Sequence, residues 1–114
     1  FISIGSIEPQ FYAQLREVAG LTEDSDFDAQ MDPRQWSALK DKLTALFKTK
    51  TRSQWCDLME GTDICFAPVL SLAEAKEHPH NVARETFVDV GGMKHPAPAP
   101  RYSVTVSDPP KRPA

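Results

Sequence analysis

The sequence has few cysteines and no long apolar run, and each shortage excludes a class of protein. Its two cysteines in 114 residues, Cys56 and Cys65, are too few for a disulfide framework and lack the spacing of metal ligands. No apolar run approaches the roughly 20 residues that cross a bilayer, and no signal-peptide pattern is present. We therefore expect a soluble protein of a reducing compartment, by default the cytoplasm.

The chain also has little excess of charge of either sign. The formal net charge is -3 and the isoelectric point is near 5.5, so the overall charge attracts neither nucleic acid nor an anionic membrane. We expect no nucleic-acid partner and no membrane association. A chain of 114 residues makes about one small domain with a modest core.

The common catalytic motifs are missing. The sequence has no Gly-rich phosphate loop, no G-x-S-x-G elbow and no cysteine–histidine metal spacing, so we expect no metal and no cofactor. His78 and His80 lie two residues apart on an irregular segment, where a structural or solvent-facing role is favoured, and the same holds for His95. No sequence neighbour would activate Cys56 or Cys65 as a nucleophile, and both are interpreted as buried fillers.

Basic and aromatic side chains recur in the middle of the chain. The basic set consists of Lys40, Lys42, Lys48, Lys50 and Arg52. These side chains would suit an anionic ligand, but a solvated helix face is the favoured interpretation. Trp36 and Trp55 lie on apolar stripes and are interpreted as core residues.

What the sequence does contain is a series of helix start and stop signals. A β-prone run at residues 1–4 and a turn at Gly5-Ser6 lead to Pro9, which suits the first position of a helix. Apolar residues then follow helical spacing until Gly20, which ends the helix. Residues 21–31 are predicted to form an exposed loop. Further start signals predict helices over residues 32–47 and 51–61 and from residue 71 onward.

The second half of the chain is predicted to hold short strands and an extended arm. Residues 65–70 are expected to be extended, with Pro68 at a sheet edge or strand end. Strands at 86–90 and 93–95 flank Gly91-Gly92, a two-residue hairpin signal. Six of the ten prolines fall after residue 95, which predicts an extended arm. The predicted fold class is α+β, with a small domain at residues 1–95, which residues 1–6 enter as strand and turn, and an arm at 96–114.

Glu8 lies where the first predicted strand hands over to the first predicted helix. Open α/β folds commonly place ligand chemistry at such junctions, whereas the plain alternative is a helix cap. Capping residues are usually Ser, Thr, Asp or Asn, so Glu8 fits that role only in part, and a cap contributes about 1 kcal/mol. From spacing alone, the structural role is favoured.

Four segments, taken together, carry a family resemblance. Residues 5–12 read G-x-I-E-P-Q-F-Y, residues 51–56 read T-R/K-x-x-W-C, and residues 61–70 read G-T-D-x-C-x-x-P-V-L. They are followed in order by His78-Pro79-His80-Asn81, Arg84, Thr86-Phe87 and the arm segment 96–101. In these motifs the chain resembles the α-methylacyl-CoA racemases of the family III CoA-transferase superfamily, from residue 1 to about residue 101.

The resemblance implies more than this chain contains. Members of the family combine a large Rossmann-like domain with a small domain, and two chains interlock into a homodimer. They interconvert the R and S forms of 2-methyl-branched acyl-CoA thioesters in lipid and fatty acid metabolism, using a histidine and an aspartate as the two bases. The resemblance places that pair upstream of residue 1, so this chain would be the small domain and the start of the return arm. In a eukaryote, it implies a peroxisomal or mitochondrial location.

One catalytic-site residue carries over by the resemblance, namely Glu8, which matches the glutamate of the I-E-P-Q segment beside the catalytic histidine. With the family in view, an active-site role for Glu8 is favoured over a cap. Two alternatives stay open. A CoA-transferase of the same superfamily would act through an aspartyl-CoA thioester, and the isolated chain would serve as a non-catalytic dimerisation or interaction domain.

Overall fold

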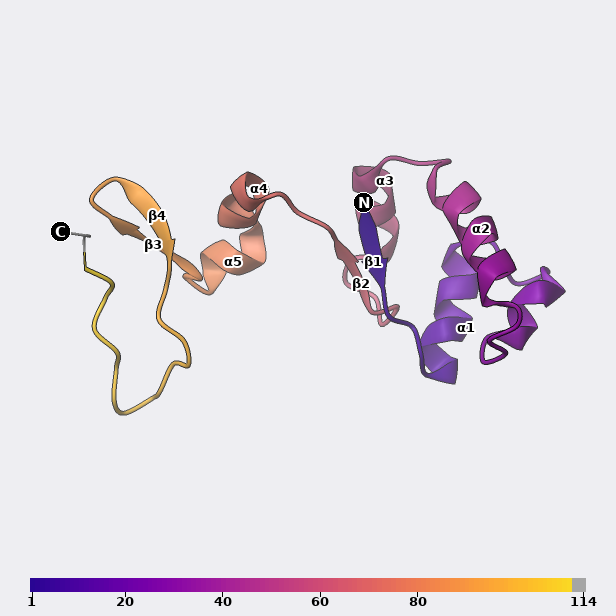
Figure 1. Cartoon of the computed structure of the whole chain (residues 1–114), viewed down its shortest axis with the longest axis horizontal. Coiled ribbons are helices and arrows are strands. Elements are labelled where there is room, and N and C mark those ends of the chain that lie inside the picture. Colours follow the sequence, from indigo (N-terminus) through magenta and orange to yellow (C-terminus); the bar gives the residue numbers. More distant parts are fainter. Residues whose placement is uncertain (112–114) are drawn as a thin grey trace. The chain divides into compact units, whose positions relative to one another are not determined.

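The computed structural model describes residues 1–111 and contains two compact units, one from Phe1 to Val69 and one that begins at Leu70. The first unit holds, in order, β1 (Ile2–Ile4), α1 (Pro9–Val18), the 3-10 helix η1 (Ser25–Ala29), α2 (Trp36–Phe47), α3 (Arg52–Met59) and β2 (Phe66–Pro68) (Figure 1). Helices and short antiparallel strands occur together, which confirms the predicted α+β class. The boundary expected between a domain at 1–95 and an arm at 96–114 stays a prediction.

Helix α1 begins and ends where the sequence predicts. Pro9 occupies the first turn, and the chain leaves the helix through Gly20, whose φ of 72° is a left-handed conformation that glycine adopts without strain. The segment after it differs from the predicted exposed loop, because η1 buries Phe27. Tyr12 donates from its hydroxyl to the Phe27 carbonyl at 2.9 Å, and Arg16 pairs with Asp28 at 2.7 Å. These contacts from α1 fold the acidic segment inward.

Helix α2 begins at Trp36, later than the predicted start at Asp32. The Asp32 carboxylate accepts hydrogen bonds from the Arg34 backbone at 3.0 Å and from the Arg34 guanidinium at 2.9 Å. Aspartate that bonds two residues ahead makes a turn that competes with helix. The pattern of Asp32 followed three residues later by Gln35 predicts a capping box, but this prediction is wrong, since Gln35 is itself the N-cap and makes no side-chain cap bond.

Helix α3 carries two large side chains into the core. Its predicted start is confirmed by a complete capping box, in which the Thr51 hydroxyl accepts from the Gln54 backbone and the Gln54 side chain accepts from the Thr51 backbone. The helix thereby holds Trp55 and Met59 fully out of solvent. The buried cluster consists of Leu15, Ala19, Trp55, Met59 and Ile64.

Strands β1 and β2 form an antiparallel pair, with Ile2 opposite Pro68 and Ile4 opposite Phe66. Backbone bonds from Val69 to Phe1 and from Gly5 to Cys65 bracket this pair. Because bonded and non-bonded positions alternate along antiparallel strands, Pro68 falls at a non-bonded position. Its missing N–H therefore costs no ladder bond, which explains how proline fits at the predicted edge.

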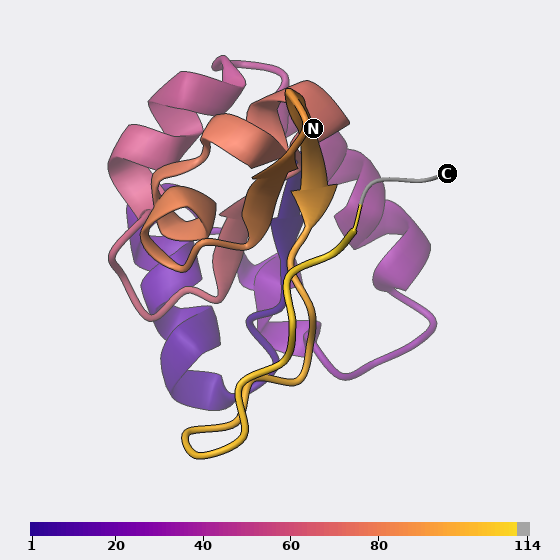
Figure 2. The same cartoon turned by 90° about the vertical axis from the view of Figure 1, so that its left-hand side faces the viewer.

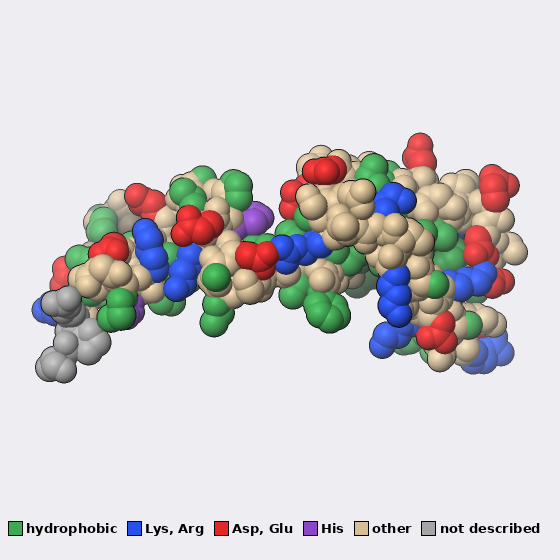
Figure 3. Space-filling model, turned by 90° about the horizontal axis from the view of Figure 1, so that it is seen from above, with side chains coloured by type: hydrophobic (Ala, Val, Ile, Leu, Met, Phe, Trp, Pro, Cys, Tyr) green, Lys and Arg blue, Asp and Glu red, His purple; other side chains and the backbone are tan. Residues whose placement is uncertain are grey.

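The second unit contains α4 (Leu72–Glu77), α5 (Pro79–Ala83), β3 (Phe87–Val90) and β4 (Met93–Pro96). Figure 2 shows the two strands of the β3–β4 hairpin side by side in orange, followed by the yellow arm. Gly91 and Gly92 both have positive φ, as a type I′ turn requires, which confirms the hairpin prediction. No residue of this unit's described part is fully buried, and hydrophobic side chains stand on its surface in Figure 3.

None of the helices in the described part of the chain has both the length and the apolar character of a membrane span.

Candidate functional site

Glu8 occupies the N-cap position of α1 with an extended backbone, at φ -70° and ψ 144°. Its side chain is exposed and makes no capping hydrogen bond to the first turn. The cap interpretation therefore lacks the contact that defines it. The carboxylate stays at the protein surface, at the end of a strand–loop–helix transition.

The loop that precedes Glu8 is fixed from two sides. On one side, the buried Ser6 hydroxyl donates to the carbonyl of Ile64, and the Gly5 N–H donates to the carbonyl of Cys65 at 3.0 Å. On the other side, the Gln30 side-chain amide donates to the carbonyls of Ser6 at 2.9 Å and Ile7 at 3.1 Å. A tight i→i+2 bond from the Ile7 N–H to the Gly5 carbonyl, at 2.8 Å, closes the loop.

Sequence reasoning missed Ser6 and Gln30. A small polar residue in the turn before α1 gives a weak signal for Ser6. Gln30 has no local signal, because its partners lie 24 and 23 positions away in the sequence.

A surface hollow lies along α1 just after Glu8. It has a volume of about 370 Å³ and is lined by Gln10, Phe11, Ala13, Gln14, Glu17 and Asp63. The Asp63 N–H donates to the Gln14 side chain at 3.0 Å, which ties the segment before β2 to α1. Two of the lining side chains are acidic, so this hollow does not suit an anionic group.

The structure divides the basic set of the sequence into two groups. Lys40, Lys48, Lys50 and Arg52 all line one groove of about 610 Å³, whose apolar side chains include Phe47 and Trp55. Lys42 lies elsewhere, because its ammonium pairs with Asp24 at 2.7 Å and with Asp26 at 2.6 Å. Figure 3 shows blue and red side chains interspersed over the first unit, at the right.

The Lys42 contacts perturb the protonation of the acidic segment. The hydrogen bond from Lys42 lowers the pKa of Asp24 below its ordinary value, and the same contact raises the pKa of Lys42. Opposite charges in contact favour the charged forms of both groups. This pair holds η1 against α2 and is a structural feature of the first unit.

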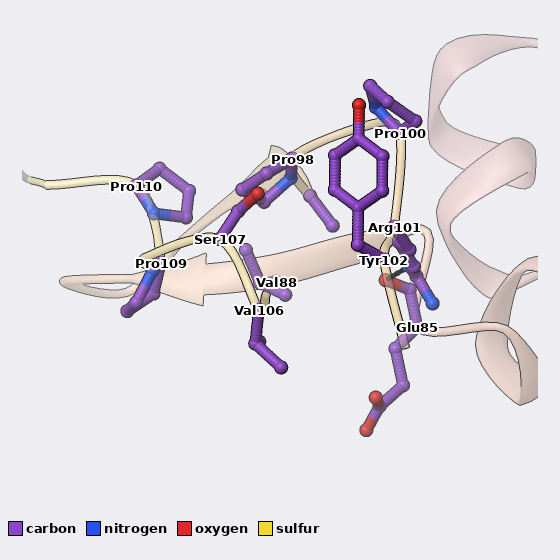
Figure 4. A pocket seen from close by; sticks show the side chains of 11 residues that line it. Glu85, Val88, Pro98, Pro100, Arg101, Tyr102, Val106, Ser107, Pro109 and Pro110 are labelled. Carbon is purple, nitrogen blue, oxygen red and sulfur yellow. Dashed lines mark hydrogen bonds between the residues drawn. The ribbon is translucent and has the colours of Figure 1, made fainter. Parts of the chain in front are cut away.

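A second hollow, of about 340 Å³, lies within the second unit (Figure 4). It is lined by Glu85, Val88 and residues of the arm from Ala97 to Pro110. Arg101 donates to the carbonyl of Glu85 at 2.6 Å, so part of the arm contacts the segment that directly precedes β3. Its lining is mostly proline and aliphatic, and it contains no set of side chains suited to acid–base chemistry.

Two of the histidines belong to α5: His78 occupies its N-cap position without a side-chain capping bond, and His80 lies within the helix. His95 lies in β4 opposite Val88. In residues 1–111 no group of three histidine, cysteine or acidic side chains is arranged to hold a metal ion. The Nε2 atom of His95 is buried and has no hydrogen-bond partner in that part of the chain.

Two sequence interpretations are wrong in part. Cys65 is exposed rather than a buried filler and lies directly before β2 with φ 58°, and Cys56 is half-buried. Burial raises the pKa of the Cys56 thiol, so this thiol is less reactive than a free cysteine. Trp55 is a core residue as expected, whereas Trp36 is 53% exposed at the start of α2 and donates from its indole to the Gln30 carbonyl at 2.9 Å.

Comparison with known proteins identifies the family of this chain. The family model described as CoA-transferase family III matches residues 1–114. The chain belongs to CoA-transferase family III. Within this family, it is 41% identical over 110 residues to the alpha-methylacyl-CoA racemase of Mus musculus, which covers 96% of this chain and 29% of that protein. It is 39% identical over 101 residues to the Homo sapiens protein of the same name, which covers 88% of this chain and 26% of that protein.

The chain thus spans under a third of the curated relatives it matches. Among solved structures, Rv3272 from M. tuberculosis in its orthorhombic form aligns at a TM-score of 0.72 and 21% identity, over 97% of this chain and 35% of that one. A mutant of Rv3272 aligns at a TM-score of 0.64 and 22% identity, over 96% and 34%. At these identities the likeness establishes a shared fold alone.

Proposed function

We propose that the full-length protein is an α-methylacyl-CoA racemase, an isomerase that interconverts the R and S forms of 2-methylacyl-CoA thioesters. The observation that carries the proposal is 41% identity to a protein named alpha-methylacyl-CoA racemase over 96% of this chain. The acyl-CoA thioester is the substrate, and no further cofactor is needed. We propose that the protein acts as a homodimer in lipid metabolism, in the cytoplasm or, in a eukaryote, in peroxisomes or mitochondria.

The reaction removes the proton from the carbon next to the thioester carbonyl and returns a proton to the opposite face. That proton is too weakly acidic to leave near neutral pH without a positioned base and stabilisation of the enolate. In this proposal, the histidine and aspartate that serve as bases lie outside residues 1–114. Glu8 lies in the catalytic site beside that histidine, where its carboxylate orients the imidazole and favours the protonated form.

The surroundings of Glu8 support this role. The carboxylate makes no capping bond, so it is available to a group from another part of the protein. The loop before it is held by four backbone or side-chain hydrogen bonds from Gly5, Ser6 and Gln30. A fixed backbone that presents an exposed, uncommitted carboxylate is the arrangement that a positioning role requires.

The test is solvent exchange by the full-length protein. In deuterium oxide, with no acceptor acid present, the racemase incorporates deuterium at the α-carbon of a 2-methylacyl-CoA and brings a single enantiomer to an R and S mixture. Glu8→Gln removes the negative charge that raises the pKa of the histidine. We expect exchange to slow about tenfold for each unit by which that pKa falls. Glu23→Gln, at another exposed glutamate, is the matched control and keeps the wild-type rate. A wild-type protein that catalyses no exchange would contradict the proposal.

The family itself favours a second candidate, because the matching model is described as CoA-transferase family III. A transferase of this kind acts through an aspartyl-CoA thioester and moves CoA from one acid to another. It would require an acceptor acid and leave the α-proton in place. CoA transfer to an added acid without deuterium incorporation would therefore favour the transferase.

A third candidate concerns the 114-residue chain on its own. Its second unit exposes large apolar side chains, with Leu72 82% exposed and Val82 and Met93 each 56% exposed. Exposed apolar patches drive association, so the isolated chain would act as a non-catalytic dimerisation or interaction domain. Light scattering of the purified chain tests this, and a concentration-independent monomer would contradict it.

A further inference from the structure

The loop from Gly5 to Ile7 determines where Glu8 points, and two side chains from distant segments hold it. Ser6 is 7% exposed, and its hydroxyl donates to the carbonyl of Ile64, a residue that is 0% exposed. The loop is thereby attached to the buried cluster of the first unit. Figure 1 shows it connecting β1 to α1.

Gln30 holds the opposite side of the same loop. Its single amide nitrogen donates to two consecutive carbonyls, of Ser6 at 2.9 Å and of Ile7 at 3.1 Å. Its own carbonyl accepts from the indole of Trp36 at 2.9 Å, so the backbone of Gln30 is fixed as well. Two bonds to successive peptide groups fix the orientation of both peptide planes, and the second of these planes joins Ile7 to Glu8.

We propose that Gln30 and Ser6 are positioning residues for racemisation, which act by fixing the direction in which Glu8 leaves the loop. This inference rests on the proposed function and on the role of Glu8 in it. Neither residue needs to contact the substrate. A carboxylate displaced by about 1 Å loses its alignment with the imidazole, and such displacements reduce rates by up to about 100-fold.

The test uses the full-length protein and the deuterium-exchange assay. Gln30→Met keeps the length of the side chain but removes both donors, and it is expected to lower kcat between about 10-fold and 100-fold with KM changed less than about twofold. Gln35→Met is the matched control, since Gln35 is exposed and makes no side-chain cap bond. It is expected to keep wild-type kcat. Ser6→Ala provides a second variant, with the same expected change in kcat.

A double-mutant cycle separates positioning from a general structural effect. If Gln30 acts through Glu8, Gln30→Met slows the wild type but changes the rate of the Glu8→Gln protein less than about twofold. Equal slowing in both backgrounds overturns the inference, and so does a slow Glu8→Gln protein beside a Gln30→Met protein of wild-type rate. A Glu8→Gln protein of wild-type rate overturns the role of Glu8 and this inference together. Absence of exchange in the wild type overturns the proposed function instead.

Discussion

Replacing Trp55 by Phe tests how the first unit joins α2 to α3. The Trp55 indole N–H donates to the carbonyl of Phe47 at 3.1 Å, at the end of α2 where helix carbonyls lack partners within the helix. The two rings also meet edge to face, with centroids 5.0 Å apart, and the Lys50 ammonium lies 4.8 Å from the centre of the indole. One side chain therefore closes a helix end, fills the core and contacts a cation.

The expected loss follows from these contacts. A part-buried carbonyl left without its donor costs about 1–3 kcal/mol. The smaller ring weakens the cation contact by up to about 1 kcal/mol, and the space it leaves adds to the cost. We expect Trp55→Phe to lower the free energy of unfolding by about 2–4 kcal/mol, a large share of the 5–15 kcal/mol typical of domains.

Urea denaturation of the 114-residue chain, followed by circular dichroism, measures this loss, which should lower the midpoint by roughly 1 M or more. Trp36→Phe is the matched control, because Trp36 is 53% exposed and water can replace its bond to Gln30. Its expected cost is below about 1 kcal/mol. Since the chain has two tryptophans, each variant leaves one as a fluorescent reporter, buried in one case and exposed in the other. Equal losses in the two variants would refute the reasoning.

Three further outcomes are expected. Thr51→Ala removes the acceptor of the capping box and should lower the free energy of unfolding by about 1 kcal/mol in urea denaturation; no change would show that the box is not stabilising. Because the folded-state pKa of Asp24 is lowered by Lys42, their pairing stabilises the chain above the ordinary aspartate pKa of 3.8 and is lost as pH falls below it. The stability difference between wild type and Lys42→Met should therefore shrink below about pH 3.8, and a constant difference would contradict this. Alkylation followed by mass spectrometry should label the exposed Cys65 before Cys56, whose thiol pKa is raised by burial, and the reverse order would contradict the structure.

Local signals in the sequence predicted most of the elements. Pro9, Thr51 and the Gly91-Gly92 turn each impose a conformation through their own backbone or side chain, and each element begins or turns where they indicate. Asp32 misled the prediction, because the same carboxylate that caps helices also forms turns with the residue two ahead, and here Arg34 provides that partner. The spacing of residues in the sequence does not show which of these two roles Asp32 takes, because the outcome depends on where the Arg34 side chain lies.

Contacts between segments far apart in the chain could not be predicted from the sequence. Phe27 looked exposed among acidic neighbours, but Tyr12 and Arg16 of α1 fold its segment inward. The attachment of the Glu8 loop by Gln30 depends on a contact between segments that no periodicity connects. The motif resemblance identified Glu8 as the candidate site residue, and its role in catalysis stays a prediction.

The pairing of β1 with β2 has a consequence for the newborn polypeptide. Ile4 of β1 pairs with Phe66 of β2, so β1 emerges from the ribosome about 60 residues ahead of β2. At synthesis rates of roughly 5–20 residues per second, it waits several seconds with a bare hydrogen-bonding edge. In that interval, the speed of translation and the access of chaperones determine whether β1 pairs with β2 of its own chain or with β2 of a neighbouring nascent chain.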